Sequence, residues 1–121
     1  MKVIFLDIDG VMTSNLLNEE IKTSNSSYPF AKECVNVLNA ILKSCKSRIV
    51  LTSSWRTVFS VEKQCKIFLE NGVIQFPYSQ TSDLGYENRS DEIRNYLTKK
   101  GNISNFLILD DMEILGFDKN F

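Results

Sequence analysis

Three short apolar runs constrain the fold of this chain more than any other feature of its sequence. Residues 3–6, 48–51 and 106–109 are rich in β-branched, aromatic and aliphatic side chains, and they are followed by Asp7, Thr52 and Asp110. Continuous apolar runs of this length are typical of strands that are buried on both faces of a parallel sheet. We therefore expect three central strands, each ending at a side chain that can take part in chemistry.

Amphipathic stretches separate these runs, because apolar residues recur in them at intervals of three and four. The first predicted helix has Pro29 in its first turn, and the second ends at a C-terminal cap formed by Asn71 and Gly72. The third begins near residues 88–90 and ends at residues 99–101, and residues 73–76 are a candidate short strand. The apolar faces of the first two helices comprise Phe30, Cys34, Val37, Leu38, Ile41, Leu42 and Cys45, and Val58, Val61, Cys65, Phe68 and Leu69.

The alternation of strands and helices predicts an α/β fold, a three-layer, doubly wound, mostly parallel sheet with helices on both faces. With 121 residues the chain is long enough for one core and too short for two ordinary domains, so residues 1–121 are expected to form a single domain. Ligands bind such sheets beyond the carboxyl ends of the strands. Residues 12–28, a loop or small hairpin, and residues 77–88, a loop, are expected to border that site.

The composition excludes some classes of site. The chain has no histidine, so sites that need an imidazole as base or metal ligand are ruled out. Its 14 basic and 15 acidic residues nearly balance, so the net charge indicates neither a nucleic-acid nor a membrane partner. Three widely spaced cysteines fit buried reduced thiols, and the N-terminus fits neither a signal peptide nor a membrane span. We expect a cytoplasmic protein with no membrane partner.

Carboxylates gather at the predicted carboxyl ends of two strands. Asp7 and Asp9 are two residues apart, so an extended backbone would point both side chains the same way, and Gly10 allows a sharp turn after them. Asp110 and Asp111 form a second acidic pair. A cluster of three or four carboxylates needs a cation or protons to neutralise it, and oxygen ligands without His or Cys favour Mg²⁺.

Four segments, taken together and in order, resemble the motifs of the haloacid dehalogenase-like (HAD) phosphohydrolase superfamily. They are VIFLDIDGV, IVLTSSW, Arg89 before a helix, and FLILDD, and they extend over residues 3–111. The segments SSWR and NRSDEIRNYL further resemble HAD domains of bacterial nucleic-acid repair proteins. The resemblance implies a HAD-like Rossmannoid fold, phosphatase activity and a Mg²⁺ cofactor.

The resemblance also implies a role for each matching residue. Asp7 would attack the substrate phosphorus and form an aspartyl-phosphate, and Asp9 would act as general acid and then as general base. Thr52, helped by backbone amides around Ser53, would bind phosphoryl oxygens. Mg²⁺ would be held by Asp7, by the backbone carbonyl of Asp9 and by one of the two aspartates that end FLILDD.

Arg89 stands where the family has a lysine or arginine that offsets negative charge on the phosphoryl group and on the nucleophile. An ordinary solvated position at the start of a helix is the alternative for this residue. Arg94, Lys99 and Lys100 are rival candidates for the cationic role.

A structural role is an alternative for other residues of the second motif. Thr52 and Ser53 can bind phosphate, cap the following helix, or do both. Trp55 and Arg56 are candidates for substrate contact, the first by stacking on a base and the second by clamping a phosphate. Packing in the core is the favoured alternative for Trp55.

The spacing between the motifs leaves no room for the cap domain that family members acting on small metabolites usually carry. The resemblance then implies an open site, which favours a large phosphorylated substrate, a polynucleotide end or a protein. A small nucleotide stays possible if residues 12–28 fold over the site as a flap. Only residues 112–121 follow the last motif, so the fold is trimmed at that edge or the chain is a fragment, and the exposed edge could bind a partner or a second copy.

The leading hypothesis is a Mg²⁺-dependent phosphomonoester hydrolase that works through Asp7. A phosphatase domain for nucleic-acid end processing is a second candidate. A receiver-type phosphoacceptor module and a non-catalytic HAD-like scaffold are alternatives from another class. A receiver places its acidic pair and its phosphoacceptor on different strands, whereas Asp7 and Asp9 follow the same predicted strand.

Overall fold

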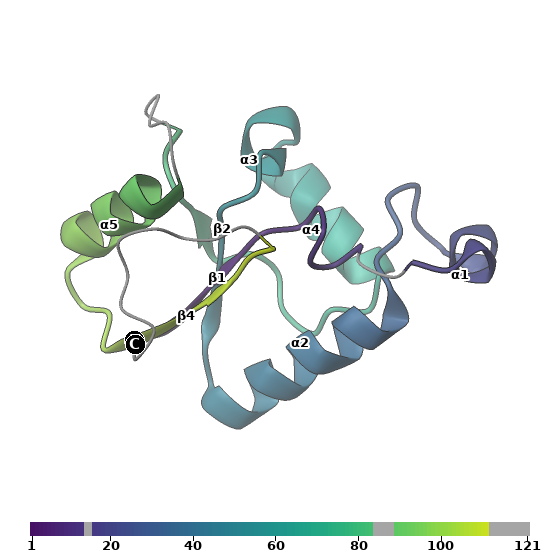
Figure 1. The fold of residues 1–121 in the computed structure, drawn as a ribbon, viewed down its shortest axis with the longest axis horizontal. Coiled ribbons are helices and arrows are strands. Elements are labelled where there is room, and N and C mark those ends of the chain that lie inside the picture. Colours follow the sequence, from purple (N-terminus) through teal and green to yellow (C-terminus); the bar gives the residue numbers. More distant parts are fainter. Residues whose placement is uncertain (14–15, 84–88, 112–121) are drawn as a thin grey trace.

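The computed structural model describes residues 1–13, 16–83 and 89–111. Four parallel strands form one sheet in the spatial order β3-β2-β1-β4 (Figure 1). Their bounds are β1 (Lys2–Leu6), β2 (Arg48–Leu51), β3 (Ser79–Gln80) and β4 (Asn105–Leu109). Strand order runs outward from β1 through β2 to β3 and then reverses to β4. The predicted α/β fold with a parallel, doubly wound sheet is confirmed.

Helices cover both faces of this sheet. They are α1 (Asn18–Thr23), α2 (Lys32–Cys45), α3 (Trp55–Val58), α4 (Val61–Glu70) and α5 (Arg89–Lys100). Figure 1 shows α2 and α4 on one side of the strands and α5 on the other. Across the described residues, no helix has both the length and the apolar character that crossing a membrane requires.

The central strand β1 is buried on both faces, as its continuous apolar run predicts. Ile4 and Leu6 belong to a core cluster with buried side chains of α2 and α4. Val3 and Phe5 belong to a second cluster with Ile93 of α5. This alternation follows from the two-residue period of a strand and produces the three layers of the fold.

Two predicted positions are wrong: the start of the first long helix, α2, and the place of the short strand after α4. Pro29 lies before α2, which begins at Lys32, because tertiary hydrogen bonds hold the preceding residues in another conformation: the Phe30 N–H donates to the Asn71 side chain. Residues 73–76 form no strand; the third strand of the structure is β3, inside the stretch that was expected to be a loop. Residues 12–28, for which we expect a loop or small hairpin, contain the short helix α1, and residues 14–15 of this range lie outside the described residues.

The predicted second helix is two helices, and its apolar face is partly wrong. The chain becomes extended at Phe59, and the Ser60 side chain caps α4 by accepting from the Lys63 N–H at 3.1 Å. Because α3 and α4 are separate helices, the predicted apolar face does not continue from one to the other. Its residues at both ends therefore point to solvent. Among the apolar residues assigned to the core, the structure exposes Val37, Cys45, Val58, Val61 and Leu69.

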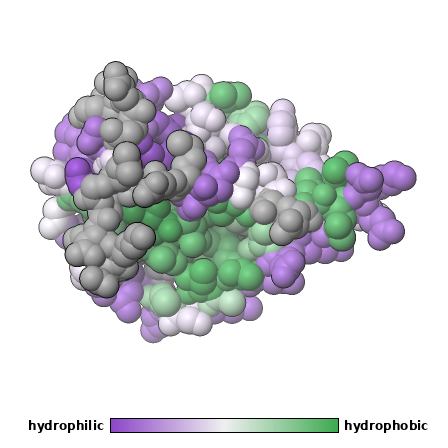
Figure 2. Space-filling view, viewed as in Figure 1, coloured by the Kyte–Doolittle hydropathy of each residue, from purple (hydrophilic) through white to green (hydrophobic). Residues whose placement is uncertain are grey.

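An apolar strip lies between α2 and β4 (Figure 2). Among the described strands β4 is an edge strand, and Leu107 on it is exposed. A cavity of about 230 Å³ in this strip is lined by Ile4, Ile41, Phe106 and Leu107, among others. Within the described part of the chain, β4 therefore has no strand beside it on one side. The surface along this edge is apolar.

Asn71 joins the segment before α2 to the end of α4. Its Oδ1 accepts from the Phe30 N–H at 2.8 Å, and its Nδ2 donates to the Tyr28 and Ile67 carbonyls at 3.0 and 2.8 Å. We expect Asn71→Ala to lower the free energy of unfolding by about 2–3 kcal/mol, since each bond contributes about 1 kcal/mol. Urea unfolding followed by circular dichroism measures this. Exposed Asn36 of α2 is the control, and equal losses in Asn36→Ala and Asn71→Ala would contradict the assignment.

Candidate active site

The register of the parallel strands brings three polar residues to one edge of the sheet. Leu6 pairs with Leu109, and the Asp7 N–H donates to the Leu109 carbonyl at 3.0 Å, so Asp7 and Asp110 leave the sheet side by side. On the other side of β1, the Thr52 N–H donates to the Leu6 carbonyl at 2.9 Å. The carboxyl ends of β1, β2 and β4 therefore meet around Asp7.

Three carboxylates converge at this edge. Asp7, Asp110 and Asp111 each offer an oxygen, and these oxygens lie within 4.8 Å of one another. Asp7 is 6% exposed and the Asp110 side chain only 1%, whereas Asp111 is exposed. Both members of the second acidic pair thus reach the cluster, where the sequence left open which of them would do so.

Asp9 lies differently from Asp7. The strand ends at Leu6, and a turn follows in which the Val11 and Met12 N–H groups both donate to the Ile8 carbonyl. Asp9 is exposed in this turn, and its carboxylate lies outside the group of three described above. The two-residue period that predicted a common direction for Asp7 and Asp9 does not extend this far, because the backbone is no longer a strand.

Position 10 requires a glycine for two reasons, the backbone conformation and the closeness of the Asp111 side chain. Its φ of +81° lies in the left-handed region that side chains disfavour. A Cβ at this position would also overlap the carboxylate of Asp111. The turn that the sequence predicts at Gly10 is therefore also the surface against which the third carboxylate of the cluster packs.

Arg89, the first residue of α5, reaches into the cluster. Its Nη1 lies 3.1 Å from Asp7 Oδ1 and 2.7 Å from Asp110 Oδ2. Burial alone would lower the pKa of Arg89, but the bond to Asp110 and the charge of Asp7 outweigh it and raise the pKa. The rivals Lys99 and Lys100 are exposed at the far end of α5, about 15 Å away at 1.5 Å per residue.

The donor set of this cluster fits a hard divalent cation. Three carboxylates face one guanidinium among the described residues, so the site carries an excess of negative charge. Burial raises the pKa of Asp7, Arg89 opposes this effect, and the charge of Asp110 adds to it. Closely spaced oxygen ligands without nitrogen or sulfur suit Mg²⁺.

The loop after β2 presents backbone donors beside the carboxylates. Thr52 and Ser53 are buried, and the Ser53 hydroxyl accepts from the Trp55 N–H at 3.2 Å. Within the described part of the chain, the N–H groups of Ser53 and Ser54 have no hydrogen-bond partner. The Ser53 side chain thus bonds within its own loop, whereas α3 has Ser54 at its N-cap without a side-chain bond. The two amides are candidate donors to an anion.

A model of the protein family described as "HAD domain in Swiss Army Knife RNA repair proteins" matches residues 3–120. The chain belongs to this family. The match confirms both the resemblance to HAD proteins and the narrower likeness to nucleic-acid repair domains, because it includes all four motif segments. No curated protein and no solved structure matches the chain significantly.

Arg56 of the HAD domain is engaged inside the protein. Its side chain is 6% exposed, forms an ion pair with Glu92 of α5, and donates to the carbonyls of Thr52 and Ser53. Arg56 is a candidate for contact with a substrate phosphate, and in the structure it holds the backbone of the loop after β2. Glu92 was missed, because only its buried partner distinguishes it from an ordinary acid in the first turn of a helix.

Trp55 packs in an aromatic cluster. Its ring centroid lies 5.1 Å from that of Phe59, 5.7 Å from that of Tyr28 and 5.9 Å from that of Phe30. Its 9% exposure leaves little surface for a base to stack on. Trp55 therefore packs in the core, which is the role that the sequence favours for it.

The buried Arg56–Glu92 pair leads to a prediction about stability. Glu92→Gln leaves the Arg56 guanidinium buried without its counter-charge, so we expect the free energy of unfolding to fall by about 3–5 kcal/mol. Glu62→Gln, at an exposed position in the first turn of α4, is the control and should cost less than about 1 kcal/mol. Chemical denaturation measures both variants, and similar small losses would contradict a structural role for the pair.

The raised pKa of Asp7 predicts a pH-dependent stability of the metal-free domain. The folded state holds the Asp7 proton more tightly than the unfolded state, so stability is lost as pH rises through the folded pKa. In a chelator near neutral pH, Asp7→Asn should therefore have a higher melting temperature than the wild type, because the variant buries no charge at this position. The difference should vanish below the ordinary carboxyl pKa of 3.8.

Exposed Asp83 is the matched control, and Asp83→Asn should follow the wild type at every pH. Thermal scans from acid to neutral pH measure all three proteins. A lower melting temperature of Asp7→Asn at neutral pH would show that the Arg89 bond outweighs burial and Asp110, contrary to this account.

Proposed function

We propose that this HAD domain is a Mg²⁺-dependent phosphomonoester hydrolase that acts on the phosphorylated end of an RNA. The observation that carries the proposal is the convergence of three carboxylates and one arginine at the carboxyl end of the sheet. Membership of the HAD family supports it independently.

Asp7 is the nucleophile in this proposal. It is the central carboxylate, between Asp110 on one side and the Thr52 loop on the other. An Asp7 oxygen attacks the phosphorus, the bond from phosphorus to the ester oxygen breaks, and an aspartyl-phosphate forms. Arg89 holds the Asp7 Oδ1 at 3.1 Å and so orients the carboxylate for this attack.

Asp9 is the proton carrier. As a carboxylic acid it gives its proton to the departing alkoxide, and as a carboxylate it then takes a proton from water. That water attacks the phosphorus, the bond to Asp7 breaks, and inorganic phosphate leaves. An exposed position in a turn suits this role, because Asp9 must reach both the leaving group and solvent.

The transferred phosphoryl group would bind between two sets of donors. The N–H groups of Ser53 and Ser54 and the Thr52 hydroxyl lie on the β2 side of Asp7, and the Arg89 guanidinium lies on the Asp110 side. Donors fixed in this way stabilise charge that develops on the non-bridging oxygens. Arg56 supports the first set by holding the carbonyls of Thr52 and Ser53.

Asp7, Asp110 and Asp111, with the backbone carbonyl of Asp9, would hold Mg²⁺. When bound, the ion would neutralise the carboxylates and the phosphoryl oxygens and so allow an anionic nucleophile to approach an anionic substrate. The Asp110 side chain is buried and contacts Arg89, whereas Asp111 is exposed and packs over Gly10. Each aspartate would contribute a carboxylate oxygen to the ion.

Two observations support RNA as the substrate. The family description names RNA repair proteins. The described segments between Asp9 and Thr52 and between Thr52 and Arg89 hold the small elements α1 and α2, and α3, α4 and β3. A site bordered by such small elements suits a substrate whose own bulk excludes water.

Phosphate release from 5′- and 3′-phosphorylated RNA oligonucleotides, and from an aryl phosphate, tests the proposal. We expect turnover that requires Mg²⁺ and falls by at least about a thousandfold in Asp7→Asn, because the nucleophile is lost. Asp9→Asn should fall by about a hundredfold or more, the usual contribution of acid–base catalysis. Glu62→Gln, at an exposed position on α4, is the control and should keep full activity.

Four outcomes would count against all or part of the proposal. Turnover that persists in a chelator would exclude a metal-dependent site, and full activity of Asp7→Asn would exclude the aspartyl-phosphate. A stable phosphoprotein without phosphate release would favour the receiver-type alternative. Equal rates with phosphorylated RNA and aryl phosphate would keep the hydrolase and remove RNA as its substrate.

A further inference from the structure

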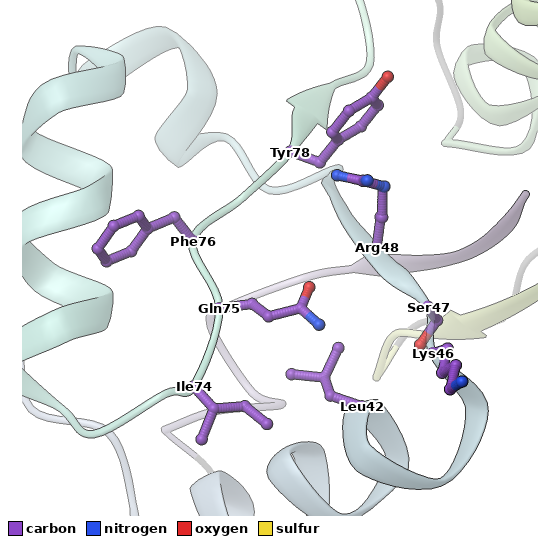
Figure 3. Close-up of a pocket in the computed structure, with 8 residues that line it drawn as sticks. All are labelled: Leu42, Lys46, Ser47, Arg48, Ile74, Gln75, Phe76 and Tyr78. Atoms are coloured by element: carbon purple, nitrogen blue, oxygen red, sulfur yellow. The ribbon is translucent and has the colours of Figure 1, made fainter.

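A second cavity lies at the opposite end of the sheet from the carboxylates. It has a volume of about 550 Å³, within the range of small-molecule sites. The end of α2, the start of β2 and residues 74–78 surround it (Figure 3). Arg48 lines this cavity at the first residue of β2, and Thr52 follows the last, so about 13 Å of strand separates the two sites.

Cations converge on this cavity. Lys46 and Arg48 line it, and the Arg48 guanidinium lies over the Tyr78 ring, 4.8 Å from its centroid. Lys100 reaches the same tyrosine from α5 and donates to its hydroxyl at 3.1 Å. This bond and the nearby positive charges lower the pKa of Tyr78. Among the described residues that line the cavity none is acidic, so its electrostatics favour an anion.

Apolar side chains are exposed near these cations. Within residues 74–78, Ile74, Phe76 and Tyr78 are exposed, whereas the residues between them are less so. Figure 3 shows Tyr78 and Arg48 on one side of this segment and the Phe76 ring on the other. Exposed aromatic rings near lysine and arginine side chains are a typical surface for single-stranded nucleic acid, where bases stack and phosphates pair with cations. An isolated phosphate would not use these apolar side chains.

A buried hydroxyl also lacks a partner at this cavity. Ser47 is 3% exposed and lies between Lys46 and Arg48 in the lining, and its Oγ has no hydrogen-bond partner among the described residues (Figure 3). Leaving such a group unpaired costs free energy, so buried hydroxyls are normally bonded. A polar group of a ligand in the cavity would provide the missing partner.

We infer that this cavity binds one nucleotide of a single-stranded RNA, with its phosphate at Arg48 and Lys100 beside Tyr78 and its base against Ile74, while a neighbouring base stacks on the exposed Phe76 ring. A polar atom of the nucleotide bonds to Ser47. The segment that follows the cavity leads toward the carboxylates: the Tyr78 N–H donates to the Ile49 carbonyl at 2.8 Å, and the Thr81 N–H to the Leu51 carbonyl at 3.0 Å. A strand bound here could pass along β3 to Asp7, a step that rests on the proposed function.

Fluorescence anisotropy with an unphosphorylated, fluorescently labelled single-stranded RNA tests the inference. This probe has no phosphomonoester, so its binding is independent of the hydrolase proposal, and failure of either proposal leaves the other measurable. Arg48→Gln/Lys100→Gln removes the two cations that contact Tyr78. Lys22→Gln/Lys32→Gln removes two exposed cations on α1 and at the start of α2, and so keeps the same net charge.

We expect the cavity variant to bind at least about tenfold more weakly than the control variant, and its plot of log affinity against log salt to be shallower by about 0.7 per lost phosphate contact. Phe76→Ala should weaken binding by about tenfold without changing the salt slope, because it removes stacking alone. Duplex RNA should bind more weakly than the single strand, since its bases are not free to stack.

Equal affinities of the cavity and control variants would overturn the inference, as would equal binding of duplex and single strand. Binding to anionic vesicles or to a phosphopeptide, with none to the RNA, would also overturn it. Circular dichroism and melting temperature establish that each variant is folded before its affinity is interpreted. Ser47→Ala then gives a second measure, and unchanged affinity in that variant would remove Ser47 from the site.

Discussion

Mutual repulsion of carboxylates at the end of β1 and β4 is the constraint on which the rest of the site depends. Parallel register alone places Asp7 beside Asp110, and the approach of Asp111 to Gly10 adds a third carboxylate. Burial of such a group is unfavourable unless a cation joins it. Arg89 meets this requirement in part, so α5 has to pack with its first residue against the end of the sheet. The charge that remains is what makes the edge a candidate cation site.

The first turn of α5 connects both halves of the candidate site. Arg89 contributes a cation to Asp7 and Asp110, and Glu92, three residues later, contributes an anion to Arg56. Arg56 in turn holds the loop after β2. The helix contributes the cation to the pairs with Asp7 and Asp110 and the anion to the pair with Arg56, so α5 cannot slide along the sheet without separating all three. The spacing between the carboxylates and the loop after β2 is thus set by one helical turn.

The sequence predicted the parts of this structure that depend on local pattern. Apolar runs identified β1, β2 and β4, and polar residues at their ends identified the site, because both follow from burial of a parallel sheet. The position of β3 was not predictable, since it depends on backbone bonds from residues 78–81 to β2 and not on apolar side chains. Arg56 and Glu92 were missed as a pair for the same kind of reason: they are 36 residues apart and meet only in the folded chain.

The candidate site and the distant cavity lie at the two ends of one small sheet. Among the described residues only small elements border the carboxyl end, so in the proposed function few of their contacts would distinguish one phosphorylated end from another. Specificity for a polymer then has to come from contacts with residues of the polymer away from its end, because only these add binding energy without altering the reacting group. The cations and aromatic rings around Tyr78 lie where such contacts would be made, one strand length from Asp7.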